Sequence, residues 1–286
     1  MVISDGNSNT HSRVGPSSEA VHRLVCTEVW GGNSVAESTV EVPGFTAWVH
    51  SRPLQPATAG GDVYYLAVCS KGLLSRVVLA DVAGHGQAVS ATATTLRDLL
   101  RKHMNALDQS VLMREMNEAF RSNDHTENVQ YATAAVFGYF CKTGELVFTN
   151  AGHPEALWYH AAEKTWDWLH DETPYRQAAM EGVPLGLIPG TDYVQSAVRL
   201  GQGDLLVLFT DGISESTDET DNELGYDGLL QLAKQLPSHT TDSPSAAGQA
   251  LMTAVSAFRG TSPSLDDQSL VVLQQTSANM ASYAGT

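Results

Sequence analysis

An apolar strand that ends in an aspartate and a glycine turn decides the fold of this chain: residues 77–86 read VVLADVAGHG. The apolar run is long enough for one buried strand, and the glycines end it in a turn. Apolar residues then recur at helical spacing from Val89 to Leu100, so an amphipathic helix is expected over residues 89–103. The pattern therefore places a carboxylate, that of Asp81, between the end of a buried strand and the start of a helix.

Further strand-like and helical segments lie on both sides of this stretch. Strands are predicted over residues 45–50, 62–68, 76–81, 131–140, 145–149, 155–159, 165–169, 193–199, 204–210 and 268–273. Besides the helix at 89–103, helices are predicted over residues 109–120, 227–236 and 244–258. Hairpins followed by paired helices, without regular strand–helix alternation, indicate an α+β domain. Two antiparallel sheets flanked by helices would accommodate these elements.

The chain has 286 residues, which suits one large domain with a substantial core. Residues 1–20 and 276–286 have little apolar content and are predicted to be tails, the first of them disordered. Residues 21–40 contain a run of small residues and are predicted to be an N-terminal arm or helix. The rest of the chain, residues 41–275, is predicted to be a single domain.

The charge balance and the cysteines exclude several classes of protein. Sixteen Lys and Arg against 32 Asp and Glu give a net charge of −16, which repels phosphate backbones and anionic lipids. We therefore expect neither nucleic acid nor a membrane as a partner. Three widely spaced cysteines form no CxxC pair, so neither a disulfide framework nor a zinc knuckle is indicated. With no apolar run near the ~20 residues of a membrane span, we expect a cytoplasmic protein.

Aspartates mark the ends of the central predicted strands. Asp62 opens a strand after two glycines, Asp81 and Asp211 close apolar strands, and the pair Asp266 and Asp267 precedes the last strand. Any one of them could simply begin a turn. Several carboxylates that converge at strand ends repel one another unless cations neutralise them. Oxygen ligands without thiolates or paired imidazoles favour Mg²⁺ or Mn²⁺ over zinc.

These aspartates belong to a series of short motifs that keeps one order along the chain. The motifs are GGD at 60–62, DVAGHG at 81–86, NAGHP at 150–154, PLG at 184–186, TDG at 210–212 and DDQS at 266–269. The series resembles the SpoIIE-like branch of the metal-dependent protein phosphatases, the PPM family of the protein phosphatase 2C superfamily. The resemblance implies a four-layer α-β-β-α sandwich, in which two antiparallel sheets are flanked by helices.

The resemblance also implies hydrolysis of phosphoserine and phosphothreonine proteins with two Mn²⁺ or Mg²⁺ ions. By this resemblance, Asp81 would bridge both ions and the backbone carbonyl of Val82 would serve one of them. Asp62, Asp211 and Asp266 would supply the other carboxylate ligands. Two such ions would activate a water for direct attack on phosphorus, so Asp81 and Asp62 are the predicted catalytic residues.

Four side chains near the motifs have roles that the sequence leaves open. Asp267 follows the last ligand and, by the resemblance, would support the ligands without touching an ion. His85 in the glycine turn could assist protonation or cap the following helix. His153 could be a general acid for the leaving oxygen, but a turn histidine that holds two loops together is the favoured interpretation. Arg52 could bind phosphate, although a solvated arginine is favoured.

The branch that this chain resembles dephosphorylates small anti-anti-sigma (STAS) proteins in bacterial partner-switching signalling, which regulates sigma factors. The implied partner is therefore a phosphorylated STAS-domain regulator. The alternative is a catalytically inactive phosphatase-like module that titrates a regulator, but such a module has no need of four mutually repelling aspartates. A calcium-binding structural protein is a third interpretation. It rests on the acidic residues 214–227, whose spacing does not match an EF-hand loop.

Overall fold

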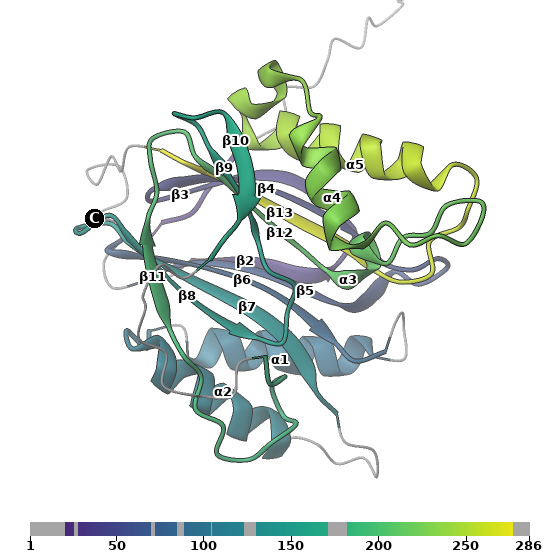
Figure 1. Ribbon diagram of the computed structural model, residues 1–286. Helices are drawn as coiled ribbons and strands as arrows, with labels where there is room; N and C mark the ends of the chain where they lie inside the picture. The colour runs from purple at the N-terminus through teal and green to yellow at the C-terminus, as the bar shows by residue number, and fades with distance from the viewer. Residues whose placement is uncertain are drawn as a thin grey trace, which may run out of the picture.

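Two β-sheets stacked face to face, with helices on both outer surfaces, make up the protein (Figure 1). The computed structural model describes residues 21–25, 28–69, 72–84, 89–103, 105–122, 130–170 and 182–276. Helices α1 and α2 cover one sheet, and α4 and α5 cover the other. The predicted α+β fold, a four-layer α-β-β-α sandwich, is confirmed. None of the helices in the described ranges has the length and hydropathy that crossing a membrane requires.

The first sheet has six strands in the order β11-β8-β7-β6-β5-β2, and all of its described pairings are antiparallel. Its strands are β2 (Val29–Ser34), β5 (Ala59–Cys69), β6 (Leu74–Val82), β7 (Ala132–Phe140), β8 (Glu145–Ala151) and β11 (Ser196–Arg199). Strands β5 to β8 are consecutive neighbours, as the predicted hairpins require. This sheet therefore forms largely from segments that follow one another in the sequence.

The second sheet has seven strands in the order β1-β3-β4-β13-β12-β9-β10. Its strands are β1 (His22–Arg23), β3 (Ala36–Val42), β4 (Phe45–Arg52), β9 (Leu157–His160), β10 (Thr165–Trp168), β12 (Leu205–Phe209) and β13 (Gln268–Gln275). The short pairing of β1 with β3 is parallel, and the other described pairings are antiparallel. Strand β13 lies between β4 and β12, so the sheet joins distant parts of the chain.

The four predicted helices begin and end close to the expected positions, and a single-turn helix and a 3-10 helix lie between them in the described chain. They are α1 (Ser90–Lys102), α2 (Gln109–Ser122), the single turn α3 (Asp211–Ser214), α4 (Gly225–Lys234), the 3-10 helix η2 (Ser238–Asp242) and α5 (Pro244–Arg259). At the start of α5, Ser243 Oγ accepts a hydrogen bond from the backbone N–H of Ala246 (3.2 Å). Gly248 lets α5 approach the sheet, because a Cβ there would lie 2.3 Å from the ring of Trp48.

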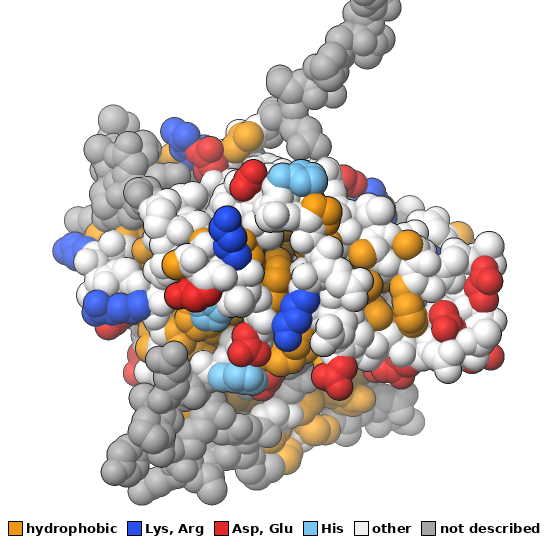
Figure 2. Space-filling view, turned by 45° about the horizontal axis from the view of Figure 1, so that its top comes forward, with side chains coloured by type: hydrophobic (Ala, Val, Ile, Leu, Met, Phe, Trp, Pro, Cys, Tyr) orange, Lys and Arg blue, Asp and Glu red, His pale blue; other side chains and the backbone are white. Residues whose placement is uncertain are grey.

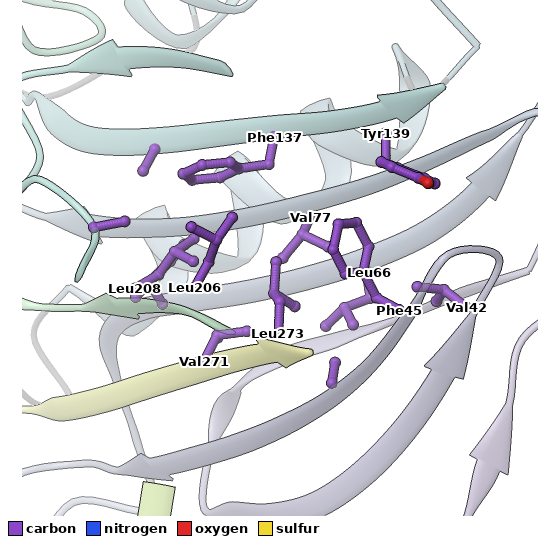
Figure 3. Packing of buried hydrophobic residues seen from close by; sticks show 14 of the residues in the cluster. Val42, Phe45, Leu66, Val77, Phe137, Tyr139, Leu206, Leu208, Val271 and Leu273 are labelled. Atoms are coloured by element: carbon purple, nitrogen blue, oxygen red, sulfur yellow. The ribbon is translucent and has the colours of Figure 1, made fainter. Parts of the chain in front are cut away.

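Alternation of apolar side chains along the strands builds two kinds of core. Between the sheets, Val77 and Phe137 belong to one buried cluster with Leu206 and Val271 of the opposite sheet (Figure 3). Residues of the opposite parity in β5 to β7 pack against α1 and α2. Each fully buried Val, Leu or Phe stabilises the fold by roughly 1.5–3 kcal/mol. These cores hold both sheets rigidly and so fix the positions of the residues at the strand ends.

Residues 21–40, expected as an arm or a helix, form strands β1 and β2 and most of β3 instead. The small residues that obscure this pattern allow close pairing, because a Cβ on Gly31 would lie 2.5 Å from the carbonyl oxygen of Tyr64 on β5. Trp30 then packs against the Tyr64 ring, with 5.1 Å between ring centroids. The segment therefore contributes to both sheets. The predicted tails, apart from Thr276, lie outside the described residues.

Candidate metal centre

Asp62 and Asp81 lie opposite each other on neighbouring strands at one end of the six-stranded sheet. The antiparallel register of β5 and β6 makes them direct partners. Val63 packs on the helical side of the sheet, so Asp62 points into the space between the sheets. There its carboxylate accepts a hydrogen bond from Thr210 Oγ1 at the end of β12 (2.9 Å). Asp62 therefore contacts both sheets.

Asp211 and Asp266 come to the same place from the seven-stranded sheet. Asp211 follows β12 and begins α3, and Asp266 lies just before β13, which pairs with β12. Gly212 makes this approach possible, because a Cβ there would lie 2.1 Å from the backbone oxygen of Asp267. The structure therefore gathers the four aspartates predicted as ligands at one end of the sandwich.

Burial and mutual repulsion strongly favour the protonated forms of the two central carboxylates. Burial raises the pKa of Asp81 to about 10, with further contributions from the charges of Asp62, Asp211, Asp266 and Asp267. Burial likewise raises the pKa of Asp62 to about 8, although hydrogen bonds from two hydroxyl groups oppose the shift. In the described residues, no Lys or Arg forms an ion pair with Asp62, Asp81 or Asp211. A cation would therefore relieve a repulsion that the protein itself leaves in place.

The available donor atoms suit hard divalent cations. They are the carboxylate oxygens; the backbone oxygen of Val82, the other predicted donor, would lie 2.8 Å from a Cβ placed on Gly61. Among the described residues, no three His, Cys, Asp or Glu side chains stand close enough together to hold one ion. Mg²⁺ usually keeps several waters and takes only one or two carboxylates. Oxygen donors of this kind suit Mg²⁺ or Mn²⁺ rather than zinc.

Asp267 is buried beside this site, and both of its oxygens are engaged by backbone. Oδ1 accepts a hydrogen bond from the N–H of Leu54 (2.6 Å), and Oδ2 accepts one from the N–H of Gly61 (2.7 Å). Gly60 must lack a side chain, because a Cβ there would lie 2.3 Å from Oδ2. Asp267 thus ties the start of β13 to the residue that precedes Asp62.

Residues 74–276 match the family model of Stage II sporulation protein E (SpoIIE). The chain belongs to the SpoIIE family. It is 26% identical to phosphoserine phosphatase RsbP of Bacillus subtilis (strain 168) over 145 residues, 49% of this chain and 33% of RsbP. It is 22% identical to phosphoserine phosphatase RsbU of the same organism over 188 residues, 64% of this chain and 50% of RsbU. This chain therefore spans half or less of the length of these curated relatives.

A solved structure supports the same fold for this SpoIIE-family chain. The SiaA-PP2C domain of Pseudomonas aeruginosa superposes with a TM-score of 0.66 and 17% identity, covering 80% of this chain and 85% of that domain. At this identity the likeness shows the shared PP2C fold alone. Of the aspartates predicted as ligands, Asp62 precedes the range that the SpoIIE model matches, and the other three lie within it.

His153 of this SpoIIE-family chain is buried between the sheets and is held on several sides. Its Nδ1 lies 2.9 Å from Thr133 Oγ1 on β7. Asn150 accepts a hydrogen bond from the His153 N–H (2.7 Å) and donates one to its carbonyl (2.6 Å). Burial lowers the pKa of His153 to about 3. A neutral, firmly held imidazole is suited to tying loops together, whereas a general acid needs a proton to give.

The remaining charged candidates occupy different positions. His85 lies outside the described residues. Arg52 ends β4 and forms an ion pair with Glu37 (2.8 Å). The Arg52 side chain is partly exposed to solvent. In the acidic segment, Asp218 accepts hydrogen bonds from Thr220 and Asn222, which lower its pKa to about 2. These contacts are those of a self-stabilised surface turn.

Two polar residues near the site were not singled out from the sequence. Thr210 hydrogen bonds to Asp62, and its position directly before Asp211 in the TDG motif was a usable signal. Asn33 on β2 donates hydrogen bonds to the carbonyl of Gly60 (3.0 Å) and to Ser90 Oγ (3.1 Å). Asn33 therefore joins the strand that carries Asp62 to the first residue of α1. Nothing in its sequence context distinguishes it.

Proposed function

We propose that this SpoIIE-family chain hydrolyses phosphoserine and phosphothreonine in proteins, with two Mn²⁺ or Mg²⁺ ions held by Asp62, Asp81, Asp211 and Asp266. The observation that carries the proposal is the convergence of these carboxylates from both sheets onto one end of the sandwich. When bound, such ions neutralise the phosphoryl oxygens and activate a water as the nucleophile. The Val82 carbonyl adds a neutral oxygen donor beside the carboxylates.

The protein's own contribution in this proposal is to fix the carboxylates before the ions bind. The hydroxyl of Thr210 orients Asp62 across the sandwich, and Asp267 holds the backbone on either side of the site. His153 keeps the loop after β8 attached to β7 without supplying a proton. Preformed ligands of this kind reduce the entropy lost when ions and phosphate bind.

The substrate in this proposal is a phosphorylated STAS-domain regulator in a cytoplasmic partner-switching circuit that controls a sigma factor. The support is the family membership of the chain and the name of its relatives RsbP and RsbU, which are phosphoserine phosphatases. The local charge does not forbid a phosphorylated substrate, because bound divalent ions would set the field at the site.

The test is hydrolysis of p-nitrophenyl phosphate and of a phosphoserine peptide by protein stripped with EDTA. We expect no hydrolysis after stripping, recovery with Mn²⁺ or Mg²⁺, and poor recovery with Zn²⁺. Full activity in EDTA after exhaustive dialysis would remove the two-metal proposal. Absence of any hydrolysis at saturating Mn²⁺ and Mg²⁺ would favour the alternative, an inactive phosphatase-like module that titrates a regulator.

A further inference from the structure

Tyr131 is an exposed aromatic residue on the rim of the carboxylate site. Thr133 on β7 is the register partner of Asp81 on β6. The pairing continues beyond the strands, since the Ala83 N–H donates to the Tyr131 carbonyl (3.0 Å). Alternate residues of an extended segment share one face, so Tyr131 lies on the same face as Thr133 and Asp81. Its side chain, 39% exposed, therefore borders the site.

The loop that follows the PLG motif lies next to Tyr131. Leu185 and Ala132 exchange two backbone hydrogen bonds (2.7 and 3.0 Å), so Gly186 is placed opposite Tyr131. Gly186 has a φ of +84°, and a Cβ there would lie 2.8 Å from the Gln130 carbonyl oxygen. A side chain at position 186 would therefore push the loop away from the rim.

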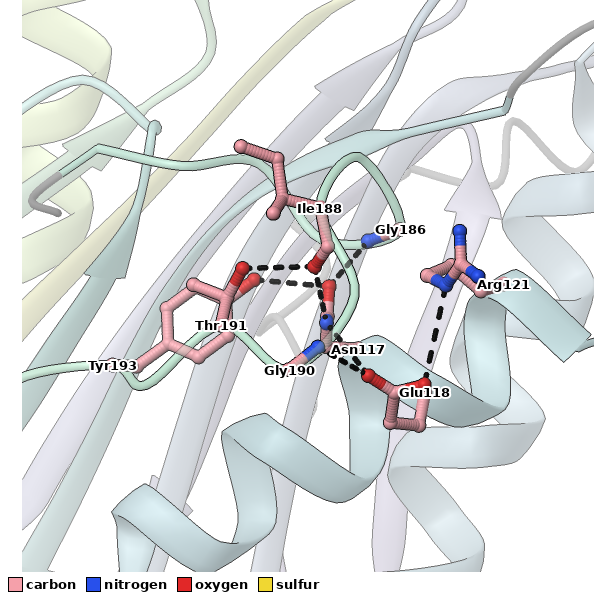
Figure 4. Close-up of polar contacts among 8 residues, drawn as sticks. All are labelled: Asn117, Glu118, Arg121, Gly186, Ile188, Gly190, Thr191 and Tyr193. Atoms are coloured by element: carbon pink, nitrogen blue, oxygen red, sulfur yellow. Dashed lines mark hydrogen bonds and ion pairs between the residues drawn. The ribbon is translucent and has the colours of Figure 1, made fainter.

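Helix α2 holds this loop in place through hydrogen bonds (Figure 4). Asn117 Oδ1 accepts a hydrogen bond from the Gly186 N–H (2.8 Å), and Asn117 Nδ2 donates one to the carbonyl of Ile188 (2.9 Å). Leu187 and Ile188 are nevertheless exposed large apolar residues. A loop that is already fixed loses little entropy when a partner covers such side chains.

Exposed apolar residues also lie on the other sides of the site. Tyr226 of α4 is 51% exposed and packs edge-on against Trp168, with 5.9 Å between ring centroids. The Tyr226 ring also lies near Phe209, with 6.1 Å between ring centroids, and Phe209 ends β12 two residues before Asp211. Leu265 is exposed and directly precedes Asp266. Exposed apolar side chains thus lie in three segments that adjoin the strand ends carrying the aspartates.

We call Tyr131, Leu187, Ile188, Tyr226 and Leu265 the apolar rim. These five residues are most of the eight large apolar side chains exposed in the described part of the chain. Single exposed apolar residues are ordinary, whereas a group around a site marks an interaction surface. Beside the rim, residues 215–227 contain six acidic residues and no Lys or Arg. Figure 2 shows acidic side chains at the right-hand edge of the molecule, where this segment lies in Figure 1.

Resting on the proposed function, we propose that the apolar rim docks the phosphoprotein substrate and selects phosphorylated residues that have apolar and basic neighbours. The apolar neighbours would cover Tyr131 and Leu187 on the side of β7. The basic neighbours would face the acidic segment on the side of α4, because opposite charges favour that orientation of the partner. Acidic neighbours of the phosphorylated residue would be repelled by the same segment.

Synthetic peptides test this proposal without knowledge of the natural substrate. The probes are peptides of one length in which phosphoserine is flanked by Leu, Lys, Ala or Glu. With Mn²⁺ present, we expect kcat/KM to be about tenfold higher for the Leu peptide than for the Ala peptide, a difference of ~1.4 kcal/mol. The Lys peptide should also exceed the Ala peptide, and the Glu peptide should be the poorest.

Variants of the rim test whether the preference for the Leu peptide over the Ala peptide comes from these residues. The double variant Tyr131→Ala, Leu187→Ala should reduce the Leu-over-Ala preference to less than about twofold, because it removes the apolar surface. The control is Leu107→Ala, which removes an apolar residue that is even more exposed, from the connection between α1 and α2. That variant should keep the wild-type preference.

The outcomes separate this proposal from the proposed function. Failure to hydrolyse any peptide or p-nitrophenyl phosphate would overturn both. Hydrolysis of all peptides at equal kcat/KM would overturn the docking proposal alone. The docking proposal would also be wrong if the double variant kept the flank preference. A changed sedimentation coefficient of that variant would then make the rim a contact between copies of this chain.

Discussion

Replacing Asp267 by alanine should destabilise the protein and loosen its metal site together. The substitution removes two short hydrogen bonds, from the N–H groups of Leu54 (2.6 Å) and Gly61 (2.7 Å). A hydrogen bond to a charged group contributes about 1.5–3 kcal/mol, and the N–H of Leu54 is only partly buried, so water can replace one partner. Two such bonds would together contribute about 3–6 kcal/mol. We expect the free energy of unfolding to fall by about 3 kcal/mol, the lower end of this range.

The same contacts position two of the proposed ligands, because Gly61 precedes Asp62 and Asp267 follows Asp266. Loss of groups that orient metal ligands typically costs about 10–100-fold in metal affinity. The Mn²⁺ concentration for half-maximal hydrolysis of p-nitrophenyl phosphate should therefore rise at least about tenfold. Asp267→Asn should be intermediate, since the amide keeps one acceptor oxygen but places an NH2 donor against the other N–H.

The assay combines urea unfolding in EDTA with a Mn²⁺ titration of activity. The matched control is Asp204→Ala, at the opposite end of β12, where a buried carboxylate accepts hydrogen bonds from Trp158 Nε1 and from the N–H groups of Ala161 and Gly201 (2.9 Å each). This control should lose stability but keep the wild-type Mn²⁺ requirement. An Asp267→Ala variant with an unchanged Mn²⁺ requirement would refute the positioning role.

Three further predictions concern the carboxylates and His153. Asp81→Asn should lower turnover at saturating Mn²⁺ by more than about 100-fold while the metal-free protein stays folded; turnover near the wild-type value would exclude Asp81 as a ligand. His153→Ala should lower hydrolysis of phosphoserine peptide and of p-nitrophenyl phosphate alike, with a lower melting temperature. A loss confined to the peptide at unchanged melting temperature would instead make His153 the general acid. The metal-free protein should lose stability as pH rises from about 5 to 8, because the raised pKa values of Asp62 and Asp81 mean that the folded state binds protons the unfolded chain has released. Melting temperatures in EDTA check this trend, which Asp81→Asn should weaken and which a flat profile would contradict.

The local elements of the fold could be predicted because their patterns are local. Strand β6 and helix α1 follow from an apolar run, a glycine turn and helical spacing, all within residues 77–103. Strand β2 could not be predicted in this way, since Gly31 has low strand propensity and is favoured only by the close approach of Tyr64 on β5. The place of β13 between β4 and β12 likewise depends on pairings between distant segments.

In the candidate site, too, some residues can be recognised from the local sequence, whereas others depend on contacts between distant segments. The aspartates predicted as ligands stand out in the sequence because a carboxylate at the end of a buried apolar strand is costly unless something neutralises its charge. The partners that orient them do not stand out. Thr210 reaches Asp62 across the sandwich, and Asp267 reaches the N–H of Leu54, 213 residues away in the chain. Such contacts exist only after the two sheets have packed, so residue type and spacing alone do not reveal them.

The central position of β13 has a consequence for how the protein folds during its synthesis. Ser51 on β4 and Ser269 on β13, 218 residues apart, are hydrogen bonded in the finished sheet (3.0 Å). A nascent chain still on the ribosome must therefore wait for β13 before β4 and β12 can be joined. Contacts of such long sequence separation also slow folding. Until this part of the chain is made, Asp266 and Asp267 are missing, so the proposed phosphatase could act only after β13 has been synthesised and has paired.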